Sequence, residues 1–245
     1  VGVTARPPAP PVSDPMDNQR RRQRLNALWR QAAPLASPLA RPARLYLENR
    51  GVPLEEYPAV LRCHPALACY GLERQPLGRY PALLALVADA DGRPVTLHRT
   101  YLTLAGEKAP VPEVRKLFPY PGDRRLSGGA IRLFPPTVEL HLAEGIETAL
   151  AVHLATGGPV WSAVNAGLLE RVEVPKMVQQ VVIWGDLDRA GAGQSAAYAL
   201  AKRLRREGRE VMLRLPAGPI PLAQKSLDWL DLLVQQGPAA LRMAA

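Results

Sequence analysis

The feature that most constrains this chain is a pair of acidic motifs, each of which follows a short apolar run. Glu144 follows V-E-L-H-L-A, and Asp186 and Asp188 lie at the end of V-V-I-W-G-D-L-D. A helix-like pattern comes after each motif, so both are typical of the ends of buried parallel strands. Loops and helix N-termini meet at that edge of an open α/β sheet, and ligands bind there. The sequence therefore predicts one acidic centre at this edge.

A metal site is the expected use of these acids, because carboxylates gathered at one edge repel one another unless a cation joins them. Hard oxygen ligands suit Mg²⁺ or Mn²⁺, which also handle phosphates. Asp186 and Asp188 alternate with Leu187 in an extended segment, so both side chains point the same way and can hold one metal or two. Asp228 and Asp231, in S-L-D-W-L-D, are further candidate ligands. Two alternatives stay open: the first pair forms a solvated turn, and Asp228 caps a helix.

The excess positive charge is confined to the first part of the chain. Residues 1–137 carry 20 Lys and Arg against 11 Asp and Glu, whereas residues 138–245 carry 11 of each. A basic half joined to a metal-binding half suits a polyanion that is held by one and processed by the other. A surface that only keeps the protein in solution is the alternative.

Cysteine content and hydropathy exclude several classes of protein. Cys63 and Cys69 are the only cysteines, too few for a disulfide framework or a four-ligand zinc site, and they fit a reducing cytoplasm. No apolar run approaches the ~20 residues that span a bilayer, and the N-terminus lacks a signal-peptide pattern. We therefore expect a cytoplasmic protein without a membrane partner. The initial Val indicates a processed product or a piece of something longer.

The chain divides into four predicted segments. Residues 1–17 are rich in proline and poor in large apolar groups, so we expect a disordered linker. A basic part follows at 18–137, and it opens with a helix at 18–33 whose arginines face either phosphates or solvent. From 138 to 236 strands alternate with helices, which predicts a parallel sheet covered on both faces. Residues 237–245 complete the chain as a tail.

Hydrophobic periodicity and turn residues place the individual elements. In the basic part we expect a second helix at 42–49, a hairpin of strands 83–88 and 94–101 around D-A-D-G, and a basic loop at 105–130. In the C-terminal part we expect strands at 138–143, 159–164, 180–185 and 210–215, and helical segments at 146–156, 167–172, 190–207 and 226–236. The expected fold class is α/β, with a parallel sheet flanked by helices and preceded by a smaller basic α+β subdomain.

The ordered motifs resemble a known family. The strings E-G-I-E-T-A-L, V-W-S-A-V-N-A-G, G-D-L-D-R-A-G-A-G-Q-S-A and D-W-L-D resemble the Toprim domain of bacterial primases, topoisomerases and some nucleases, and in particular its phage- and plasmid-type primase branch. Upstream, 42–52 resembles the segment before the primase catalytic domain, and 79–102 resembles the basic primase subdomain. The similarity covers about residues 25–236. It departs at Gly185 and Leu187, where this branch commonly has Ala and Asn.

The resemblance implies roles for the acidic residues. The family has a Glu after the first strand and an Asp-x-Asp after the third, which here are Glu144 and the pair Asp186 and Asp188. Glu144 is then the candidate catalytic residue, either as general base for the attacking hydroxyl or as support for the metal. A capping role at the start of the helix explains the nearby Glu147.

Basic residues and glycines are the candidate contacts to nucleotide and nucleic acid. By the resemblance, Arg79, Arg99 and Lys116 are the best basic candidates for holding template and nucleotide. Gly191 and Gly193 lie in the first turn of a predicted helix, where they allow close backbone approach and a phosphate at the N-terminal amides.

The resemblance implies synthesis of short primers on single-stranded DNA, by Mg²⁺-assisted nucleotidyl transfer from NTPs. A Toprim nuclease or nicking enzyme is the enzymatic alternative, and a replication or mobilisation factor that only binds single-stranded DNA is the non-catalytic one. The sequence contains neither zinc-ribbon cysteines nor G-x-x-x-x-G-K-[ST]. We therefore expect a replicative helicase to be supplied in trans or by a missing segment.

Overall fold

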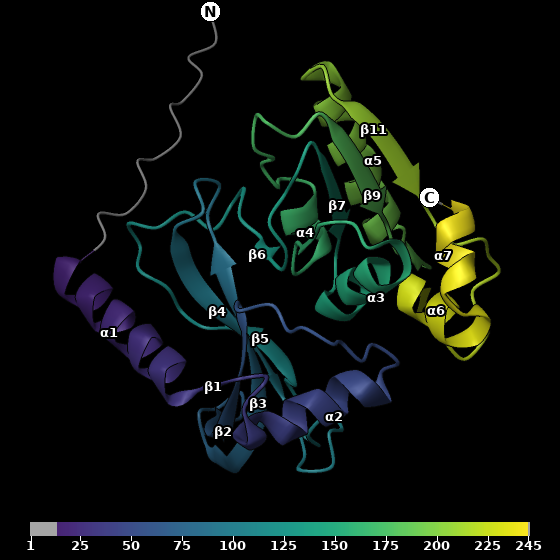
Figure 1. Cartoon of the computed structure of the whole chain (residues 1–245). Helices are drawn as coiled ribbons and strands as arrows, with labels where there is room; N and C mark the ends of the chain where they lie inside the picture. The colour runs from purple at the N-terminus through teal and green to yellow at the C-terminus, as the bar shows by residue number, and fades with distance from the viewer. Residues whose placement is uncertain (1–13, 245) are drawn as a thin grey trace, which may run out of the picture.

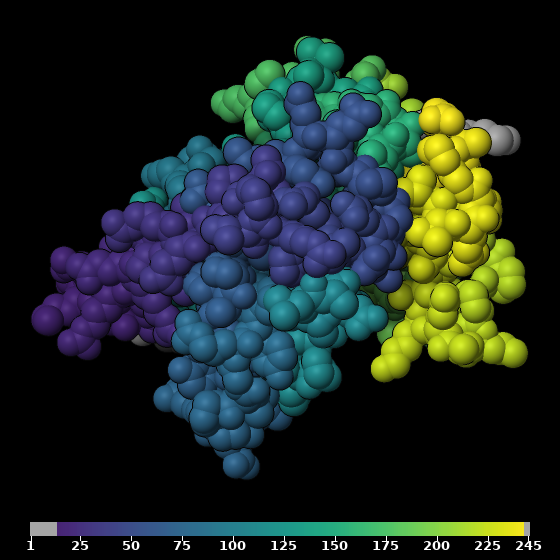
Figure 2. Space-filling view, turned by 60° about the horizontal axis from the view of Figure 1, so that its bottom comes forward, coloured from purple at the N-terminus to yellow at the C-terminus, as the bar shows by residue number. Residues whose placement is uncertain are grey.

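The computed structural model describes residues 14–244, arranged as two halves that pack against each other (Figure 1). Helix α1 (Pro15–Gln31) lies at one end of the molecule, and helices α6 (Trp229–Gln236) and α7 (Pro238–Ala244) lie at the other (Figure 2). Residues 1–13 of the predicted linker lie outside the described residues.

The N-terminal half is built on a five-stranded antiparallel sheet with the order β1-β2-β3-β4-β5. After α1, its elements are β1 (Ala33–Pro34), the 3-10 turn η1 (Pro38–Ala40), α2 (Arg41–Asn49), β2 (Leu61–Tyr70), β3 (Pro76–Ala88), β4 (Pro94–Tyr101) and β5 (Arg115–Leu117). The second helix and the hairpin are therefore confirmed. The sequence pattern missed β2 altogether, and it missed β5 inside the predicted basic loop.

Helix α1 begins three residues earlier than predicted. The carboxylate of Asp14 accepts a hydrogen bond from the Met16 amide at 2.9 Å, and proline occupies the first helical position. Both features favour a helix start, because the cap satisfies a free amide and proline has no amide to satisfy. Residues 15–17 are thus helical rather than part of a linker.

The turn between β3 and β4 shows why this hairpin forms where it does. One carboxylate oxygen of Asp89 accepts hydrogen bonds from the amides of Asp91 and Arg93, at 3.0 and 2.8 Å. Gly92 has φ +84°, a left-handed conformation that other residues rarely adopt. The motif D-A-D-G therefore supplies both the side-chain bonds and the backbone freedom that the turn requires.

The two faces of the N-terminal sheet have different partners. Leu84 and Leu97 belong to an apolar cluster that α1 covers. Leu83 and Ala85 belong to a second cluster, which also contains buried residues of the C-terminal half such as Leu150. Because side chains alternate along a strand, neighbouring residues of β3 pack into these two different clusters.

The C-terminal half contains a five-stranded sheet with the order β11-β9-β7-β8-β6, in which only β6 is antiparallel. Its elements are β6 (Ile131–Arg132), β7 (Glu139–Ala143), α3 (Ile146–Thr156), β8 (Val160–Ser162), α4 (Ala166–Leu169), β9 (Gln180–Trp184), β10 (Leu187–Asp188), α5 (Ala192–Arg206), β11 (Glu210–Arg214), β12 (Ser226–Leu227), α6 and α7. The predicted α/β fold with a parallel sheet is confirmed. Strand β6 lies upstream of the predicted boundary at residue 138 but joins this sheet.

Helices cover both faces of the parallel sheet, as the alternation of strands and helices predicted. Leu200 and Leu204 of α5 pack with Ile183 in one apolar cluster. On the other face, Leu150 of α3 packs with Trp184. No helix within residues 14–244 is long and apolar enough to cross a membrane.

The C-terminal elements differ from the prediction at two points. The helix expected from residue 226 starts at Trp229, because Ser226 and Leu227 pair with β10 and Asp228 then caps the helix. The predicted tail contains α7, whose Leu241 is fully buried in the core with α3. These residues therefore complete the fold instead of extending from it.

An ion pair between a buried carboxylate and a partly exposed guanidinium joins the two halves. Glu147 of α3 is 6% exposed, and its carboxylate accepts hydrogen bonds from Arg115 of β5 at 2.7 Å and from the Tyr46 hydroxyl of α2 at 2.5 Å. Burial acts to raise the pKa of Glu147, but the charge of Arg115 and the Tyr46 hydrogen bond hold it below its ordinary value. Glu147 is therefore an ionised contact between the halves, and the capping role predicted for it is not its main one.

We expect Arg115→Ala to lower the free energy of unfolding by about 2–4 kcal/mol, because it leaves the buried Glu147 carboxylate without its cation. Lys116→Ala is the matched control, because Lys116 is the next residue of β5 and forms an exposed pair with Glu113. It should cost less than about 1 kcal/mol. Urea unfolding followed by circular dichroism measures both. Equal losses for the two variants would contradict the assigned role of Arg115.

Candidate active site

The acidic residues leave the parallel sheet at the same edge. Ala143 of β7 and Trp184 of β9 are register partners, and Glu144 and Asp186 follow them along the chain. Strand β8 fixes the first of these loops, since the Ser162 hydroxyl donates to the backbone carbonyl of Glu144 at 2.9 Å. Burial, and then the charge of Asp188, raise the pKa of the Glu144 carboxyl.

Asp186 is the centre of the acidic group. Its Oδ1 is buried and has no hydrogen-bond partner among the described residues. Burial raises the pKa of Asp186 to about 8, and the charges of four other carboxylates add to this rise. In order of effect, these carboxylates are Asp228, Glu144, Asp188 and Asp231. The structure therefore brings every acidic residue predicted for the site within electrostatic reach of Asp186.

Asp188 is held by the first turn of α5. Its two oxygens accept hydrogen bonds from the amides of Ala192 at 3.2 Å and Gly193 at 2.7 Å. Burial acts to raise the pKa of Asp188, but these backbone hydrogen bonds lower it. A Cβ on Gly193 would lie 3.0 Å from both Asp188 Oδ2 and the Asp186 carbonyl, so only glycine permits this close approach. Gly191, with φ +77°, makes the turn into the helix. The amides predicted to receive a phosphate are thus engaged by Asp188.

Asp228 and Asp231 form a capping box at the start of α6. The Asp231 amide donates to the Asp228 carboxylate at 2.9 Å, and the Asp228 amide donates to the Asp231 carboxylate at 3.1 Å. The alternative of an N-cap at Asp228 is therefore correct. The next residue, Trp229, donates its indole N–H to the Gly185 carbonyl at 3.1 Å. This bond ties α6 to the loop that carries Asp186.

The backbone at this edge is strained. Val164, which follows β8, has φ +74° although it is β-branched. A branched side chain in the left-handed region costs of order 1–3 kcal/mol and persists only where surrounding contacts hold it. Here the following residue, Asn165, caps α4 by accepting a hydrogen bond from the Leu168 amide at 3.0 Å. Val164 also lines a small cavity together with Arg115 and Glu147.

The acidic group fits a divalent cation in its chemistry, although its ligands are not yet gathered. Within the part of the chain that the structure describes, no three His, Cys, Asp or Glu side chains form a group that could hold an ion as they stand. The fit rests on the unpartnered Asp186 oxygen and on the repulsion that raises the pKa of its carboxyl. An oxygen-rich set of this kind suits Mg²⁺ or Mn²⁺.

Basic residues of the N-terminal half face this acidic edge. Partial burial, and then the charges of Arg115 and Arg50, lower the pKa of Lys108, whereas Glu147 and Asp228 act to raise it. Burial raises the pKa of Asp228, and Arg50 opposes that rise. The sequence pattern did not single out Arg50, although Arg50 lies within the 42–52 segment that resembles primases. Lys108 and Arg115 were expected only as residues of a basic loop.

The three basic residues predicted from the resemblance lie elsewhere. Arg79 is exposed on β3. Arg99 of β4 and Lys116 of β5 are register partners, and Arg99 stacks on Phe118 at 4.1 Å, on the sheet face that α1 covers. Arg115, one residue before Lys116, points to the opposite face and contacts Glu147. The structure therefore does not bring Arg99 and Lys116 to the acidic edge.

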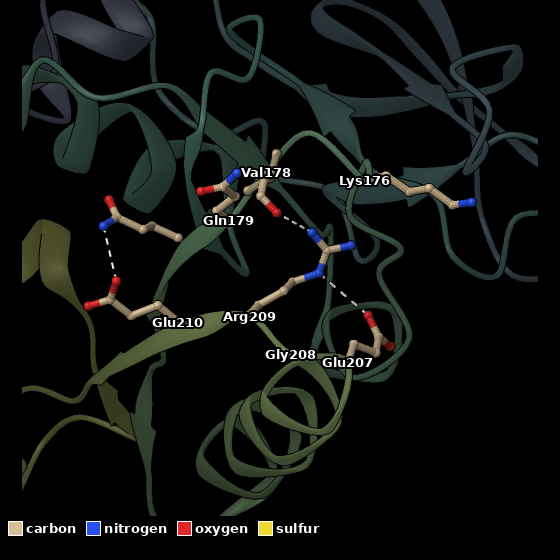
Figure 3. Close-up of a pocket in the computed structure, with 8 residues that line it drawn as sticks. Lys176, Val178, Gln179, Glu207, Gly208, Arg209 and Glu210 are labelled. Atoms are coloured by element: carbon tan, nitrogen blue, oxygen red, sulfur yellow. Dashed lines mark hydrogen bonds and ion pairs between the residues drawn. The ribbon is translucent and has the colours of Figure 1, made fainter.

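A large hollow of about 450 Å³ lies at the opposite edge of the parallel sheet, where β9 and β11 begin (Figure 3). Arg209 crosses it and donates hydrogen bonds to the carbonyls of Val174, Pro175 and Val178. Its guanidinium also pairs with Glu207 at 3.5 Å. Arg209 thus stabilises the fold by tying a loop to the end of α5. The hollow lies at the far edge of the sheet from Glu144, Asp186 and Asp188.

We expect Asp186→Asn to stabilise the metal-free protein at neutral pH, by about 1–3 kcal/mol, because the raised pKa makes the Asp186 carboxyl take up a proton on folding, a cost that the neutral amide does not have. The pKa of Asp186 is raised from 3.8 to about 8 on folding, so its contribution to stability is fully present below pH 3.8 and is lost as the pH rises through about 8. Thermal unfolding in EDTA across this range should therefore show a shallower pH dependence in the variant.

Glu73→Gln, an exposed carboxyl-to-amide change, is the control for that comparison and should behave as wild type. Mg²⁺ should raise the melting temperature of wild type and of Glu73→Gln, but not that of Asp186→Asn. A Mg²⁺ effect that survives in Asp186→Asn would exclude Asp186 as a ligand.

Comparisons with known proteins agree with this fold. Residues 139–239 match the family model of the Toprim domain, and residues 19–133 match a domain of unknown function, DUF7146. A comparison with curated proteins finds no match.

Solved structures of primases share the fold across both halves. The single-stranded-DNA-bound catalytic domain of DnaG primase has a TM-score of 0.56 at 18% identity, covering 94% of this chain and 79% of that one. The Escherichia coli primase catalytic core has a TM-score of 0.56 at 17% identity, covering 93% and 78%. The RNA polymerase domain of Mycobacterium tuberculosis DnaG has a TM-score of 0.53 at 17% identity, covering 92% and 81%. The chain therefore contains a Toprim domain, at residues 139–239, and has the fold of a bacterial primase catalytic core.

Proposed function

We propose that this protein is a DNA primase of phage or plasmid type, which synthesises short primers on single-stranded DNA from NTPs. The observation that carries the proposal is the buried, unpartnered Asp186 oxygen among five carboxylates, opposite a basic face of the other half. Repelling acids opposite cations suit a triphosphate, which needs a divalent metal on one side and positive side chains on the other.

In this proposal the metal ligands come from Asp186 and Asp188, and Asp228 and Asp231 complete the site. Bound Mg²⁺ or Mn²⁺ would neutralise the charge of the triphosphate. Asp188 has a lowered pKa and so stays ionised at neutral pH. The hydrogen bonds from α5 fix the position of the Asp188 carboxylate. In this proposal the helix N-terminus therefore orients a metal-binding side chain and does not itself bind the phosphate.

Glu144 is the proposed general base for the 3′-hydroxyl. Its pKa is raised by burial and by the Asp188 charge, so it is a stronger proton acceptor than an ordinary glutamate. A raised pKa favours general-base catalysis, because the base then takes up the proton more readily as the hydroxyl attacks. The alternative is that Glu144, at the same place beside Asp186 and Asp188, supports the metal instead of accepting the proton.

Arg50 and Lys108 are the proposed contacts to the triphosphate. Their charges reach Asp228 across the junction of the halves, and they lie close enough to each other for Arg50 to lower the pKa of Lys108, after the larger effects of burial and of Arg115, whose own partner is Glu147. Phosphate oxygens would restore a favourable environment for Lys108, whose pKa burial and neighbouring cations depress. The solved relative with bound single-stranded DNA supports a similar polymer as template here. We further propose a cytoplasmic setting and a replicative helicase as partner.

Glu144→Gln should reduce primer synthesis by about 10²–10⁴-fold, because the amide cannot accept the proton. Labelled NTPs, single-stranded DNA and Mg²⁺ provide the assay, and separate titrations should show unchanged affinity for Mg²⁺ and template. Recovery of most of the rate by Mn²⁺ or by higher Mg²⁺ would assign Glu144 to the metal instead. Wild type that incorporates no NTP, but nicks or cuts DNA in a Glu144-dependent way, would replace the primase proposal with the nuclease one.

Lys108→Ala should raise the KM for NTP about tenfold, because one cation beside the triphosphate is lost. Lys116→Ala is the matched control, since it removes a lysine from the face of the N-terminal sheet that lies away from the acidic edge. Its KM for NTP should equal that of wild type. A change in kcat alone for Lys108→Ala, or an equal rise in KM for both variants, would exclude Lys108 as a triphosphate contact.

A further inference from the structure

A groove of about 260 Å³ separates α1 from the hairpin of β3 and β4. Trp29 and Leu25 of α1 and Leu97 of β4 contribute apolar surface, and Arg22 and Arg124 lie among the lining residues. Leu97 belongs to the sheet face that α1 covers, whereas the acidic edge contacts the other face through Glu147 and Arg115. The groove is therefore a second site, separated from the carboxylates by the thickness of the sheet.

The indole of Trp29 is held in place beside the groove. The Arg62 guanidinium lies over its ring, 4.6 Å from the centroid, and donates to the Trp29 carbonyl at 2.9 Å. Trp29 is half-buried, whereas Trp161, Trp184 and Trp229 are at most 3% exposed. Trp29 is thus the one tryptophan of the chain that a ligand can reach without rearrangement of the core.

The surroundings of the groove are strongly basic. Helix α1 carries five arginines and a single aspartate, which pairs with Arg21. Arg22 pairs with Asp123, whereas Arg124 forms no ion pair among the described residues. Arg24 lies close enough to Arg99 to depress its pKa, after the larger effect of burial, so the charge continues along this face. Lys116, the register partner of Arg99, extends the charge to the edge strand β5.

We propose that this groove binds a base of single-stranded nucleic acid, with Trp29 as the stacking surface and Arg124 as a contact to a flanking phosphate. Proteins that bind single strands combine an aromatic ring with a positively charged groove, because every base can stack on a ring and every phosphodiester group carries a negative charge. A purely apolar partner would leave the Arg124 guanidinium without an anionic partner, since Arg22 already pairs with Asp123. This inference rests on the proposed function only in taking single-stranded nucleic acid as the polymer.

Intrinsic tryptophan fluorescence tests the stacking contact directly. A thymidine oligonucleotide of about 20 nucleotides should quench the emission of the full chain, and an abasic strand of equal length should not. Trp29→Phe should remove the quenching. Trp29→Leu, which keeps an apolar side chain but removes the aromatic ring, should weaken binding of the thymidine strand about tenfold or more and leave binding of the abasic strand unchanged. Thermal melting of both variants shows whether the fold is retained.

Arg124→Ala provides a second test that does not depend on the packing of Trp29. It should reduce the slope of log K against log salt by about 1, because one phosphate contact is lost. Arg206→Ala removes an equally charged, exposed residue of α5 and should leave the slope unchanged. Arg206→Ala should also leave primer synthesis unchanged.

Three outcomes would overturn the inference: equal quenching by the abasic strand, unchanged affinity in Trp29→Leu, or quenching by polyglutamate but not by the oligonucleotide. These outcomes are separate from failure of the proposed function. If Trp29-dependent binding persists in a protein that incorporates no NTP, the groove stands and the primase proposal falls. If Trp29→Leu makes primers and binds the thymidine strand with wild-type affinity, the primase proposal stands and the groove proposal falls.

Discussion

The arrangement of the two halves depends on the ion pair between Glu147 and Arg115. A buried carboxylate is costly unless a cation and hydrogen bonds compensate it, and here one strand and one helix of the N-terminal half supply both. Helix α3 can therefore bury Glu147 only where β5 and Tyr46 lie against it. This requirement also brings Arg50 and Lys108 toward the acidic edge, so the same contact that orients the halves assembles the candidate active site.

At the acidic edge, the unfavourable electrostatic energy falls mainly on Asp186. Asp188 and Asp228 each accept backbone hydrogen bonds at a helix start, which stabilises their charged forms. Asp186 has no such bond at Oδ1, and its carboxyl bears the repulsion of the others. The loop is nevertheless fixed, because Trp229 holds the Gly185 carbonyl. A rigid loop that presents an uncompensated carboxylate is what a cation site requires before the cation binds.

Sequence patterns predicted the C-terminal half well, because its strands and helices alternate and its acidic motifs sit at strand ends. They did worse where tertiary contacts decide. Strand β2 contains Pro65, and its pairing with β3 shifts register beside that proline, so its alternation is irregular. The role of Glu147 could not be inferred from α3 alone, since its partners come from distant segments. Helix α6 starts late because β12 first pairs with β10.

The basic residues show most clearly how one position in register changes a functional interpretation. Arg115 and Lys116 are adjacent in the edge strand β5, and alternation sends them to opposite faces of the sheet. Arg115 serves the junction with the acidic half, whereas Lys116 joins Arg99 on the face with the Trp29 groove. The sequence alone, without the register of the strands, would suggest that all these charges lie on one surface. With it, the sheet has two basic faces that meet at β5, so a single strand of nucleic acid that contacts both would pass around that edge.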